Sequence, residues 1–541
     1  MLKSYLLLIV IYFCVVGYSK IFKYFVLKEK DKNFYNLEIF YGFFLLIFLS
    51  LFINFFTALK NVQLLIFLIG GIAFTGFLLM KNIKIKNLVS FLTILLIIIF
   101  VSHHHWPNID TEVYHLQIIN KTFNEKIIFG LANIEEKYGM NSVWQIFLSL
   151  FNSEIVGVKI LYLINIFPIA IFFNQYYIEI KSNKSLSKYF LLLSSLFIIT
   201  FSIIHPANNG IILNHLGSTE VDLLGGFLFI IVIYIGLKLL ENFDKNLFNL
   251  LFVITSIVVL SKPSYLILTF FPLLICYLLK KNPFTKLNIF LIFFGILAFI
   301  RGFINSGCFL FPAKVSCVNT FWSLDPLKVE IYENIVLGSA RDNPLRLRYT
   351  DFDYLIHSNE WIIPWFKNYF FTTSLLQIFF IFLIFSLFLL LYFKLKKIIF
   401  FNQINTAIII FFIFCALFWF RVPEIRFGFG WIISLSIFIP AYYLLVSKID
   451  FNSKKIFSLL IVFPLILILK NYKNIYIFSQ NKNPMFNYQY EILDNFDNKN
   501  YVKIKTPHDR CVDIDEYCTY YIFDVSQKKI NGYNFFYQIR N

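Results

Sequence analysis

The residues best suited to chemistry lie between positions 103 and 145, directly after a long hydrophobic run. Pro107 ends that run, and Asp110 stands at the start of an amphipathic stretch, 111–123, whose apolar residues recur at roughly helical spacing. We expect this stretch to form a helix lying on a membrane surface, with the carboxylate of Asp110 at its N-terminus. Such a carboxylate could serve as a general base, or it could be a helix N-cap worth about 1 kcal/mol.

Other polar residues near the hydrophobic runs have simpler interpretations. His103, His104 and His105 point in different directions on a helix, so interfacial histidines explain them better than a metal site. Glu135 and Glu136 are expected to form a solvated loop pair. The segment 205–221 has no lysine or arginine, and the acids that end it, Glu220 and Asp222, are expected to cap a helix.

A second informative turn, RVPEIRF at 421–427, places Arg421, Glu424 and Arg426 between two hydrophobic runs. The arginine fork binds phosphate or carboxylate bidentately. The turn could therefore clamp a phosphate at the membrane surface, or it could form an interfacial, internally paired salt bridge. Arg301, at the end of another hydrophobic run, has the same two interpretations.

The elements that must position these residues are hydrophobic helices. Apolar residues make up 59% of the 541-residue chain and charged residues 15%, whereas a soluble domain is nearer half apolar and a quarter charged. We expect an all-α integral membrane protein of about fourteen transmembrane helices, with a membrane domain at 1–470 and a tail at 471–541. The helices are expected near 2–17, 37–57, 62–80, 88–102, 142–176, 189–204, 222–240, 247–261, 264–279, 287–303, 370–393, 405–420, 427–446 and 456–470.

The positive charge indicates topology. The formal net charge is +17, but the lysines gather in short connections between hydrophobic runs, so the charge does not point to a nucleic-acid partner. When these connections are placed in the cytoplasm, the N-terminus falls outside. The other segments that fall outside are 103–141, 205–221, 304–369, 421–426 and 471–541.

The distribution of histidine, arginine and cysteine fits this topology. All eight histidines and all eight arginines fall outside or at an outer helix end. Four cysteines also fall outside: Cys308, Cys317, Cys511 and Cys518. This even number permits disulfides such as Cys308–Cys317 and Cys511–Cys518, although pairing cannot be read from a sequence.

Several chemistries have no motif in the sequence. There is no Walker A run, no dinucleotide-type glycine motif and no G-x-S-x-G. The hydrophobic runs also lack the chain of acids that proton-coupled transporters usually need.

Several stretches resemble a group of large bacterial inner-membrane proteins, and the resemblance runs from about residue 100 to the end. The stretches are DTEVYHLQ (110–117), GLANIEEKYGMNSVWQ (130–145), SGCFLFP (306–312), RVPEIRFGFGW (421–431) and a tail with Cys511 and Cys518. These proteins are similar to the GT-C glycosyltransferase superfamily. In that superfamily, a carboxylate of the first outer loop faces a sugar carried on a polyprenyl phosphate. The chain departs from the group at Glu112, Val113, Glu135 and Glu136, and its tail lacks the expected Trp and Pro residues.

The resemblance implies an inverting glycosyltransferase that moves a sugar from a polyprenyl-phosphate donor to an envelope glycan or lipid. Transfer would occur on the extracytoplasmic face of the bacterial inner membrane. Asp110 becomes the catalytic base, and Tyr114 and His115 shape its pocket. The candidate phosphate-binding and substrate-binding residues are Arg301, Arg421, Glu424 and Arg426.

A divalent metal could share the task of holding the phosphate, and no residue is assigned to it. Two alternative functions stay open. One is an envelope polysaccharide polymerase or ligase. The other is a non-enzymatic lipid-sugar flippase or transporter, which should show an internal repeat that we do not find in the sequence.

Overall fold

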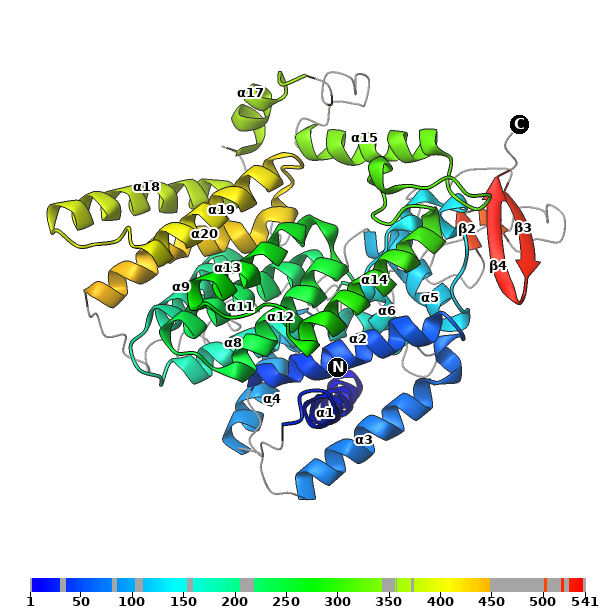
Figure 1. Ribbon diagram of the computed structural model, residues 1–541, viewed down its shortest axis with the longest axis horizontal. Coiled ribbons are helices and arrows are strands. Elements are labelled where there is room, and N and C mark those ends of the chain that lie inside the picture. The colour runs from blue at the N-terminus through cyan, green and yellow to red at the C-terminus, as the bar shows by residue number, and fades with distance from the viewer. Residues whose placement is uncertain are drawn as a thin grey trace.

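The computed structural model is mostly helical, with two small pairs of strands near the C-terminus (Figure 1). It describes residues 2–29, 36–79, 85–102, 110–152, 159–204, 218–342, 356, 358–370, 374–447, 501–503, 517–519 and 525–538. The first helices are α1 (Leu2–Phe25), α2 (Ile39–Asn54), α3 (Gln63–Leu79), α4 (Ile85–Ser102), α5 (Leu116–Asn124), α6 (Val143–Ser149), α7 (Lys159–Ile164), α8 (Ile166–Glu179) and α9 (Leu186–Ile204). The later helices are α11 (Asp222–Glu241), α12 (Lys245–Ser261), α13 (Phe270–Leu279), α14 (Lys286–Ser306), α15 (Pro326–Asp342), α17 (Ile362–Trp365), α18 (Ser374–Leu395), α19 (Gln403–Phe420) and α20 (Ile425–Val446). The strands are β1 (Tyr501–Lys503) parallel to β2 (Tyr517–Thr519), and β3 (Val525–Ile530) antiparallel to β4 (Tyr533–Gln538).

Eight helical segments of the described chain are long and apolar enough to cross a membrane, as expected of a multi-pass membrane protein. They are Tyr5–Phe25, Asn36–Asn54, Ile160–Glu179, Asp222–Glu241, Lys286–Ser306, Leu375–Leu395, Gln403–Phe420 and Ile425–Val446. Five shorter apolar helices accompany them. The helix expected at 456–470 lies outside the described residues.

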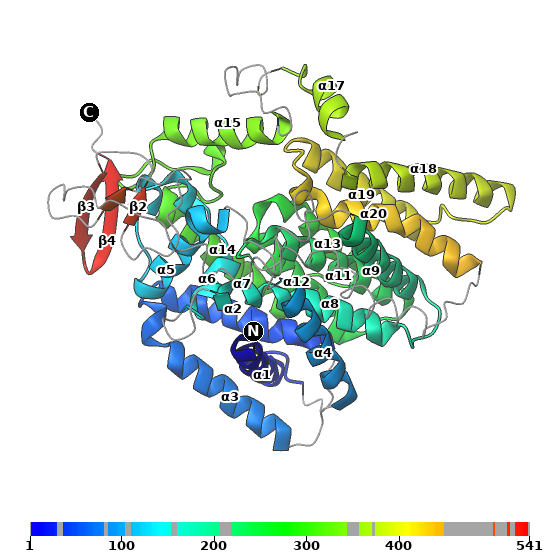
Figure 2. The same ribbon diagram turned by 180° about the vertical axis from the view of Figure 1, so that it is seen from behind.

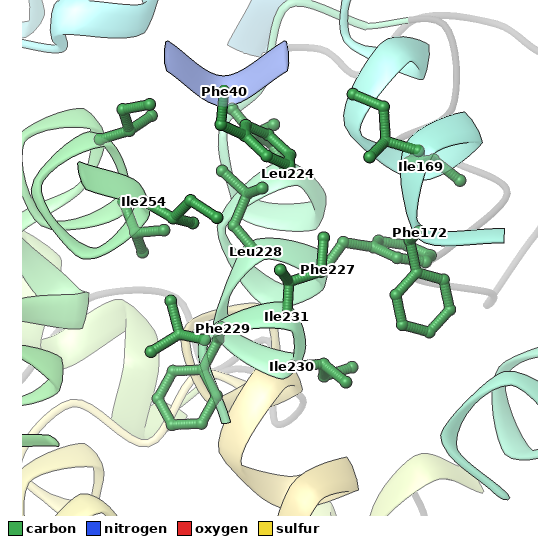
Figure 3. Close-up of a cluster of buried hydrophobic side chains, with 14 of the residues drawn as sticks. Phe40, Ile169, Phe172, Leu224, Phe227, Leu228, Phe229, Ile230, Ile231 and Ile254 are labelled. Atoms are coloured by element: carbon green, nitrogen blue, oxygen red, sulfur yellow. The ribbon is translucent and has the colours of Figure 1, made fainter. Parts of the chain in front are cut away.

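Helix α11 is surrounded by other helices. Its residues from Asp222 to Leu237 are all buried. In Figure 3, side chains of α11 such as Leu224 and Phe227 lie among Phe40 of α2 and Phe172 of α8. A helix that is apolar on every face is stable only inside such a bundle. The start of α11 is therefore held in a fixed position, together with Glu220, which precedes the helix, and Asp222, which begins it.

Helix α20 packs closely against α11 through two glycines. A Cβ on Gly226 would lie 2.3 Å from the ring of Phe429, and one on Gly430 would lie 2.6 Å from Cβ of Phe229. Small residues allow helices in a membrane to approach closely. This packing brings the start of α20, where Arg426 lies, beside the start of α11.

The bounds of two expected helices need correction. The helix expected at 142–176 is broken: α6 ends at Ser149, and α7 and α8 follow separately. The helix expected at 2–17 continues to Phe25, because Lys23 is buried in it and pairs with Glu38 of the segment preceding α2.

The stretch 111–123 is not a helix on a membrane surface. It forms a π-helical turn, η3 (Thr111–His115), followed by α5, and residues 116–122 are all buried. Ile118 packs in a cluster with Leu131, Tyr138 and Phe536. The apolar face of this helix is covered by other segments of the protein instead of by lipid.

Three segments of the chain, distant from one another in sequence, cover α5. They are residues 127–139, 306–324 and 525–538, here called the loop–hairpin cluster. The side-chain amide of Asn133 donates to the carbonyl oxygens of Gly130, Trp322 and Phe536, at 3.2, 2.8 and 3.0 Å. Phe129 pairs with β4 through its backbone, and its ring stacks on Phe535. In Figure 2, the β3–β4 hairpin lies beside α5.

The loop–hairpin cluster contains a disulfide between Cys308 and Cys317. Cys511 and the side chain of Cys518 lie outside the described residues. All three segments of the cluster were assigned by helix alternation to one side of the membrane, and the structure packs them against one another.

Gly130 should be essential to this cluster. Its φ is +68°, and a Cβ there would lie 2.1 Å from the carbonyl oxygen of Phe536 and 2.6 Å from that of Trp322. A left-handed conformation costs a non-glycine residue about 1–2 kcal/mol before any clash is counted. We expect Gly130→Ala to lower the thermal unfolding temperature in detergent and to make the C-terminal hairpin sensitive to protease.

The matched control is Gly295→Ala in α14, where a Cβ meets nothing within 4 Å. Alanine favours a helix interior over glycine by about 1 kcal/mol, so this variant should be at least as stable as the wild type. Equal stability of the two variants would contradict the role assigned to Gly130.

Candidate functional site

Asp110 and the turn at 421–427 meet directly. Nη1 of Arg426 donates to Oδ2 of Asp110 at 3.0 Å across 316 residues of sequence. Asp110 makes no N-cap hydrogen bond to the turn that follows it, so the simple capping interpretation is wrong. Its carboxylate is instead held by a tertiary ion pair.

Arg426 lies among four carboxylates. Besides Asp110, its Nη1 is 3.7 Å from Oδ2 of Asp222 and 4.0 Å from Oε1 of Glu220. Its Nε is 3.9 Å from Oε1 of Glu424. Glu220 and Asp222 were expected to be helix caps, but the N-cap residue of α11 is Val221, and both acids lie within 4.0 Å of Arg426. We call these four acids, together with Arg426 and Lys262, the acid–arginine cluster.

Lys262 is the second cation of the cluster. It follows the last residue of α12, forms an ion pair with Asp222, and places Nζ 4.2 Å from the ring centre of Phe427. Burial, and then the nearby Arg426 guanidinium, lower the pKa of Lys262, whereas the Asp222 carboxylate that it contacts favours the charged ammonium group. Lys262 was not predicted from the sequence as a site residue. The available signal was the alternation of helices, which places the short turn after 261 on the same side as Asp110.

Exposure divides the acid–arginine cluster into two layers. The side chains of Glu220 and Asp222 are 2% and 4% exposed, whereas those of Asp110 and Arg426 are 28% and 31% exposed. The buried acids therefore support Arg426 from within the bundle. The Asp110–Arg426 pair is the most exposed part of the cluster.

Tyr114 and His115 lie next to this pair. Nδ1 of His115 is 3.2 Å from the hydroxyl of Thr219, which is 3.3 Å from the hydroxyl of Thr111. Burial lowers the pKa of His115 to about 4, so the ring is neutral at pH 7. Burial and then Asp110 raise the pKa of Tyr114 well above its usual value, so its phenol stays protonated. Both side chains can position other groups without adding charge.

The family model described as "Domain of unknown function (DUF8201)" matches residues 1–433. The chain belongs to the DUF8201 family. The match includes every member of the acid–arginine cluster, and it ends before the C-terminal hairpin. No curated protein and no solved structure matches the chain.

The burial of His115 is expected to make the stability of the DUF8201 chain depend on pH. Its pKa is about 4 in the folded protein against 6.5 for an unperturbed histidine, so the unfolded state binds the proton more tightly. Above pH 6.5, His115 does not reduce the free energy of unfolding. As the pH falls toward 4, protonation of the unfolded state lowers this free energy by up to about 3 kcal/mol.

We expect the unfolding temperature to fall over this range in the wild type and to fall less in His115→Gln. The measurement is thermal unfolding in detergent at several pH values. Parallel curves for the two proteins would show that His115 is not the titrating group.

The two arginines of the 421–427 turn have different environments in this DUF8201 chain. Arg421 ends α19, is exposed, and uses its carbonyl oxygen to accept a hydrogen bond from Nη2 of Arg341 at 3.3 Å. None of the ion pairs within the described residues joins Arg421 to the acid–arginine cluster. The structure therefore brings Arg426 to Asp110 and leaves Arg421 at the surface.

Arg301 belongs to a separate polar network. It is buried, and its guanidinium donates to neutral oxygens of Thr122 at 3.1 Å and of Asn54 and Asn141 at 3.4 Å. Asn54 ends α2, Thr122 lies in the last turn of α5, and Arg301 itself is near the end of α14. The C-termini of helices carry partial negative charge, which compensates a buried cation. This arrangement supports a structural role for Arg301 in joining three helix ends.

Helix α15 extends from the loop–hairpin cluster to the turn at 421–427. Tyr332 is buried on α15, its ring stacks on Phe311, and burial followed by Asp110 raises its pKa. Near the other end of α15, Arg341 reaches the carbonyl of Arg421. In Figure 1, α15 lies across the end of the molecule between the hairpin and α19–α20. Glu135, expected to be solvated, is buried, with 2% of its surface exposed.

The described residues do not provide a metal site. No group of three or more His, Cys, Asp or Glu among them is arranged to hold a metal ion. The four acids of the acid–arginine cluster instead surround the guanidinium of Arg426. His103, His104 and His105 lie outside the described residues.

Proposed function

We propose that this DUF8201 chain is a membrane glycosyltransferase. It would transfer a sugar from a polyprenyl-phosphate donor to an envelope glycan or lipid. The observation that carries this proposal is the ion pair between Asp110 and Arg426, two partly exposed groups at one end of a bundle of apolar helices. A carboxylate and a guanidinium held together at the membrane surface are the groups that such a transfer needs.

The reaction assigns a different role to each group. Asp110 accepts the proton of the acceptor hydroxyl, a contribution of about 10²–10⁴-fold. The acceptor oxygen bonds to the anomeric carbon as the bond from that carbon to the phosphate oxygen breaks, and the electron pair leaves with the phosphate. Direct displacement inverts the configuration of the sugar.

Arg426 stabilises the charge that develops on the leaving phosphate, and one fixed donor of this kind is worth about 3–4 kcal/mol. Its guanidinium is the partly exposed cation of the pair with Asp110, and we assign it to the phosphate. Holding the guanidinium among buried acids fixes its position before the donor arrives. This preorganisation lowers the reorganisation needed in the transition state.

The finer topology is part of the proposal. It has about fourteen spans, a GT-C-like arrangement, an outer N-terminus, and the acid–arginine cluster on the extracytoplasmic face of the bacterial inner membrane. It is supported by contacts between segments that helix alternation assigns to one side: Asp110, the start of α11 and the turn before α20.

The deciding experiment measures release of polyprenyl phosphate. The purified chain in lipid nanodiscs is incubated with radiolabelled polyprenyl-phosphate sugars and an acceptor extract from a strain lacking the protein. A glycosyltransferase releases polyprenyl phosphate and forms one elongated product. A polymerase or ligase forms a product of distributed length from a lipid pyrophosphate. In sealed proteoliposomes, a flippase would instead move the lipid across the bilayer with its sugar bond intact, and that result would overturn the proposal.

A further inference from the structure

The carboxylate of Asp222 is shared between two cations. Its Oδ1 forms the ion pair with Lys262, while its Oδ2 faces Nη1 of Arg426 at 3.7 Å. Since Nη1 of Arg426 also binds Asp110, the four side chains form a row of alternating charge: Lys262, Asp222, Arg426 and Asp110. They come from four separate parts of the chain, and only the Arg426–Asp110 end of the row is substantially exposed.

Arg426 lies closer to the partly exposed end of this row than to its buried end, and burial alone does not explain this position. Its Nη1 lies 3.0 Å from the partly exposed Asp110, but 3.7 and 4.0 Å from Asp222 and Glu220, which are almost fully buried. A buried carboxylate gains more from a counter-ion than an exposed one, because it has lost its hydration. On burial alone, Arg426 should move toward Asp222 and away from Asp110.

Lys262 supplies the missing reason. Its ammonium group already neutralises Asp222, and it is held in place against the ring of Phe427. Because Asp222 already has a counter-ion in Lys262, the guanidinium of Arg426 can pair with Asp110. The buried ion pair between Lys262 and Asp222 thus controls a pairing that lies nearer the surface.

We infer that Lys262 is a positioning residue that keeps Arg426 paired with Asp110 by occupying Asp222. The pairing itself does not depend on what the protein catalyses. Its consequence for sugar transfer rests on the proposed function, in which Asp110 is the base and Arg426 holds the leaving phosphate.

The test measures how reactive the carboxylate of Asp110 is in Lys262→Met. Purified protein in nanodiscs is treated with a water-soluble carbodiimide and an amine at fixed pH, and labelling of Asp110 is quantified by peptide mass spectrometry. Without Lys262, Arg426 moves toward Asp222 and Asp110 is exposed, so labelling should rise severalfold. Lys262→Arg keeps the cation and should label like the wild type.

The double variant Lys262→Met/Asp222→Asn identifies the route. It removes one cation and one anion together and leaves Glu220 as it is in the wild type, so the charge balance around Arg426 is restored and labelling should return toward the wild-type value. Such non-additivity is expected only for side chains that are physically coupled. Equal labelling of the single and double variants, or unchanged labelling in Lys262→Met, would overturn the inference.

Loss of folding is also informative. A monodisperse double variant beside an aggregated Lys262→Met would support the coupling between Lys262 and Asp222. If neither variant folds, Lys262 does not act through Asp222, and the inference is overturned. In the transfer assay, Lys262→Met should lower kcat more than it raises KM, because the acceptor and donor sites remain. Absence of transfer in the wild type would reject the proposed function while leaving the labelling result intact.

Discussion

Replacing Asp110 by asparagine is expected to slow sugar transfer by about 10²–10⁴-fold, the usual contribution of a general base. Asparagine has nearly the same shape as aspartate, but it cannot take the proton of the acceptor hydroxyl. The fold should survive, because Arg426 keeps Glu220, Asp222 and Glu424 within 4.0 Å. The measurement is the single-turnover rate of polyprenyl phosphate release, accompanied by the thermal unfolding temperature.

Glu330→Gln is a matched control for Asp110→Asn. Glu330 lies on α15, is 46% exposed, and pairs with Lys314. This substitution also removes one carboxylate charge from an ion pair, but Glu330 is not a member of the acid–arginine cluster. It should leave transfer unchanged. Full activity of Asp110→Asn would remove the catalytic assignment, whatever the control shows.

The pairing of Asp110 with Arg426 could be anticipated from the sequence. Helix alternation placed both residues on one side of the membrane, and their chemistry is complementary. Arg421 could not be separated from Arg426 in the same way, because two arginines five positions apart in a short turn have the same sequence signal. The difference arises in three dimensions: Arg421 ends α19 at the surface, while Arg426 begins α20 against the buried start of α11.

The buried acids and Lys262 show where sequence patterns lose information. An acid at the start of a helix has the same pattern whether it caps the helix or pairs with a distant cation, and Glu220 and Asp222 do the latter. The deciding factor is the close packing of α11 on α20 at Gly226 and Gly430. No periodicity within either helix reports such a contact.

The burial of α5 has a similar explanation. An amphipathic pattern predicts one apolar face, but it does not say whether lipid or protein covers that face. Here, the covering residues include Phe536, more than 400 positions away in the sequence. The helix was therefore predicted in nearly the right place, and its environment was predicted wrongly.

Replacing Arg426 by glutamine should be the most destabilising change in the acid–arginine cluster. Glu220 and Asp222, at 2% and 4% exposure, would lose a guanidinium within 4.0 Å, and among the ion pairs of the described residues Asp222 would keep the one with Lys262. Breaking a buried ion pair by removing one partner costs about 3–5 kcal/mol. Because Arg426 is 31% exposed, we expect a loss near the lower end of that range. Transfer should fall by at least about 10²-fold, since the phosphate loses its fixed donor.

Arg421→Gln is the matched comparison, because it removes the same side chain five residues away in the same turn. Arg421 is exposed, so its loss should change stability by no more than about 0.5 kcal/mol. Lowering the pH protonates the carboxylates that Arg426 had neutralised, so the destabilisation by Arg426→Gln should shrink in acid, whereas a packing defect would persist. Equal unfolding temperatures for the two variants at pH 7 would mean that Arg426 is not the counter-ion of the buried acids, and both the cluster and the function proposed for it would need another basis.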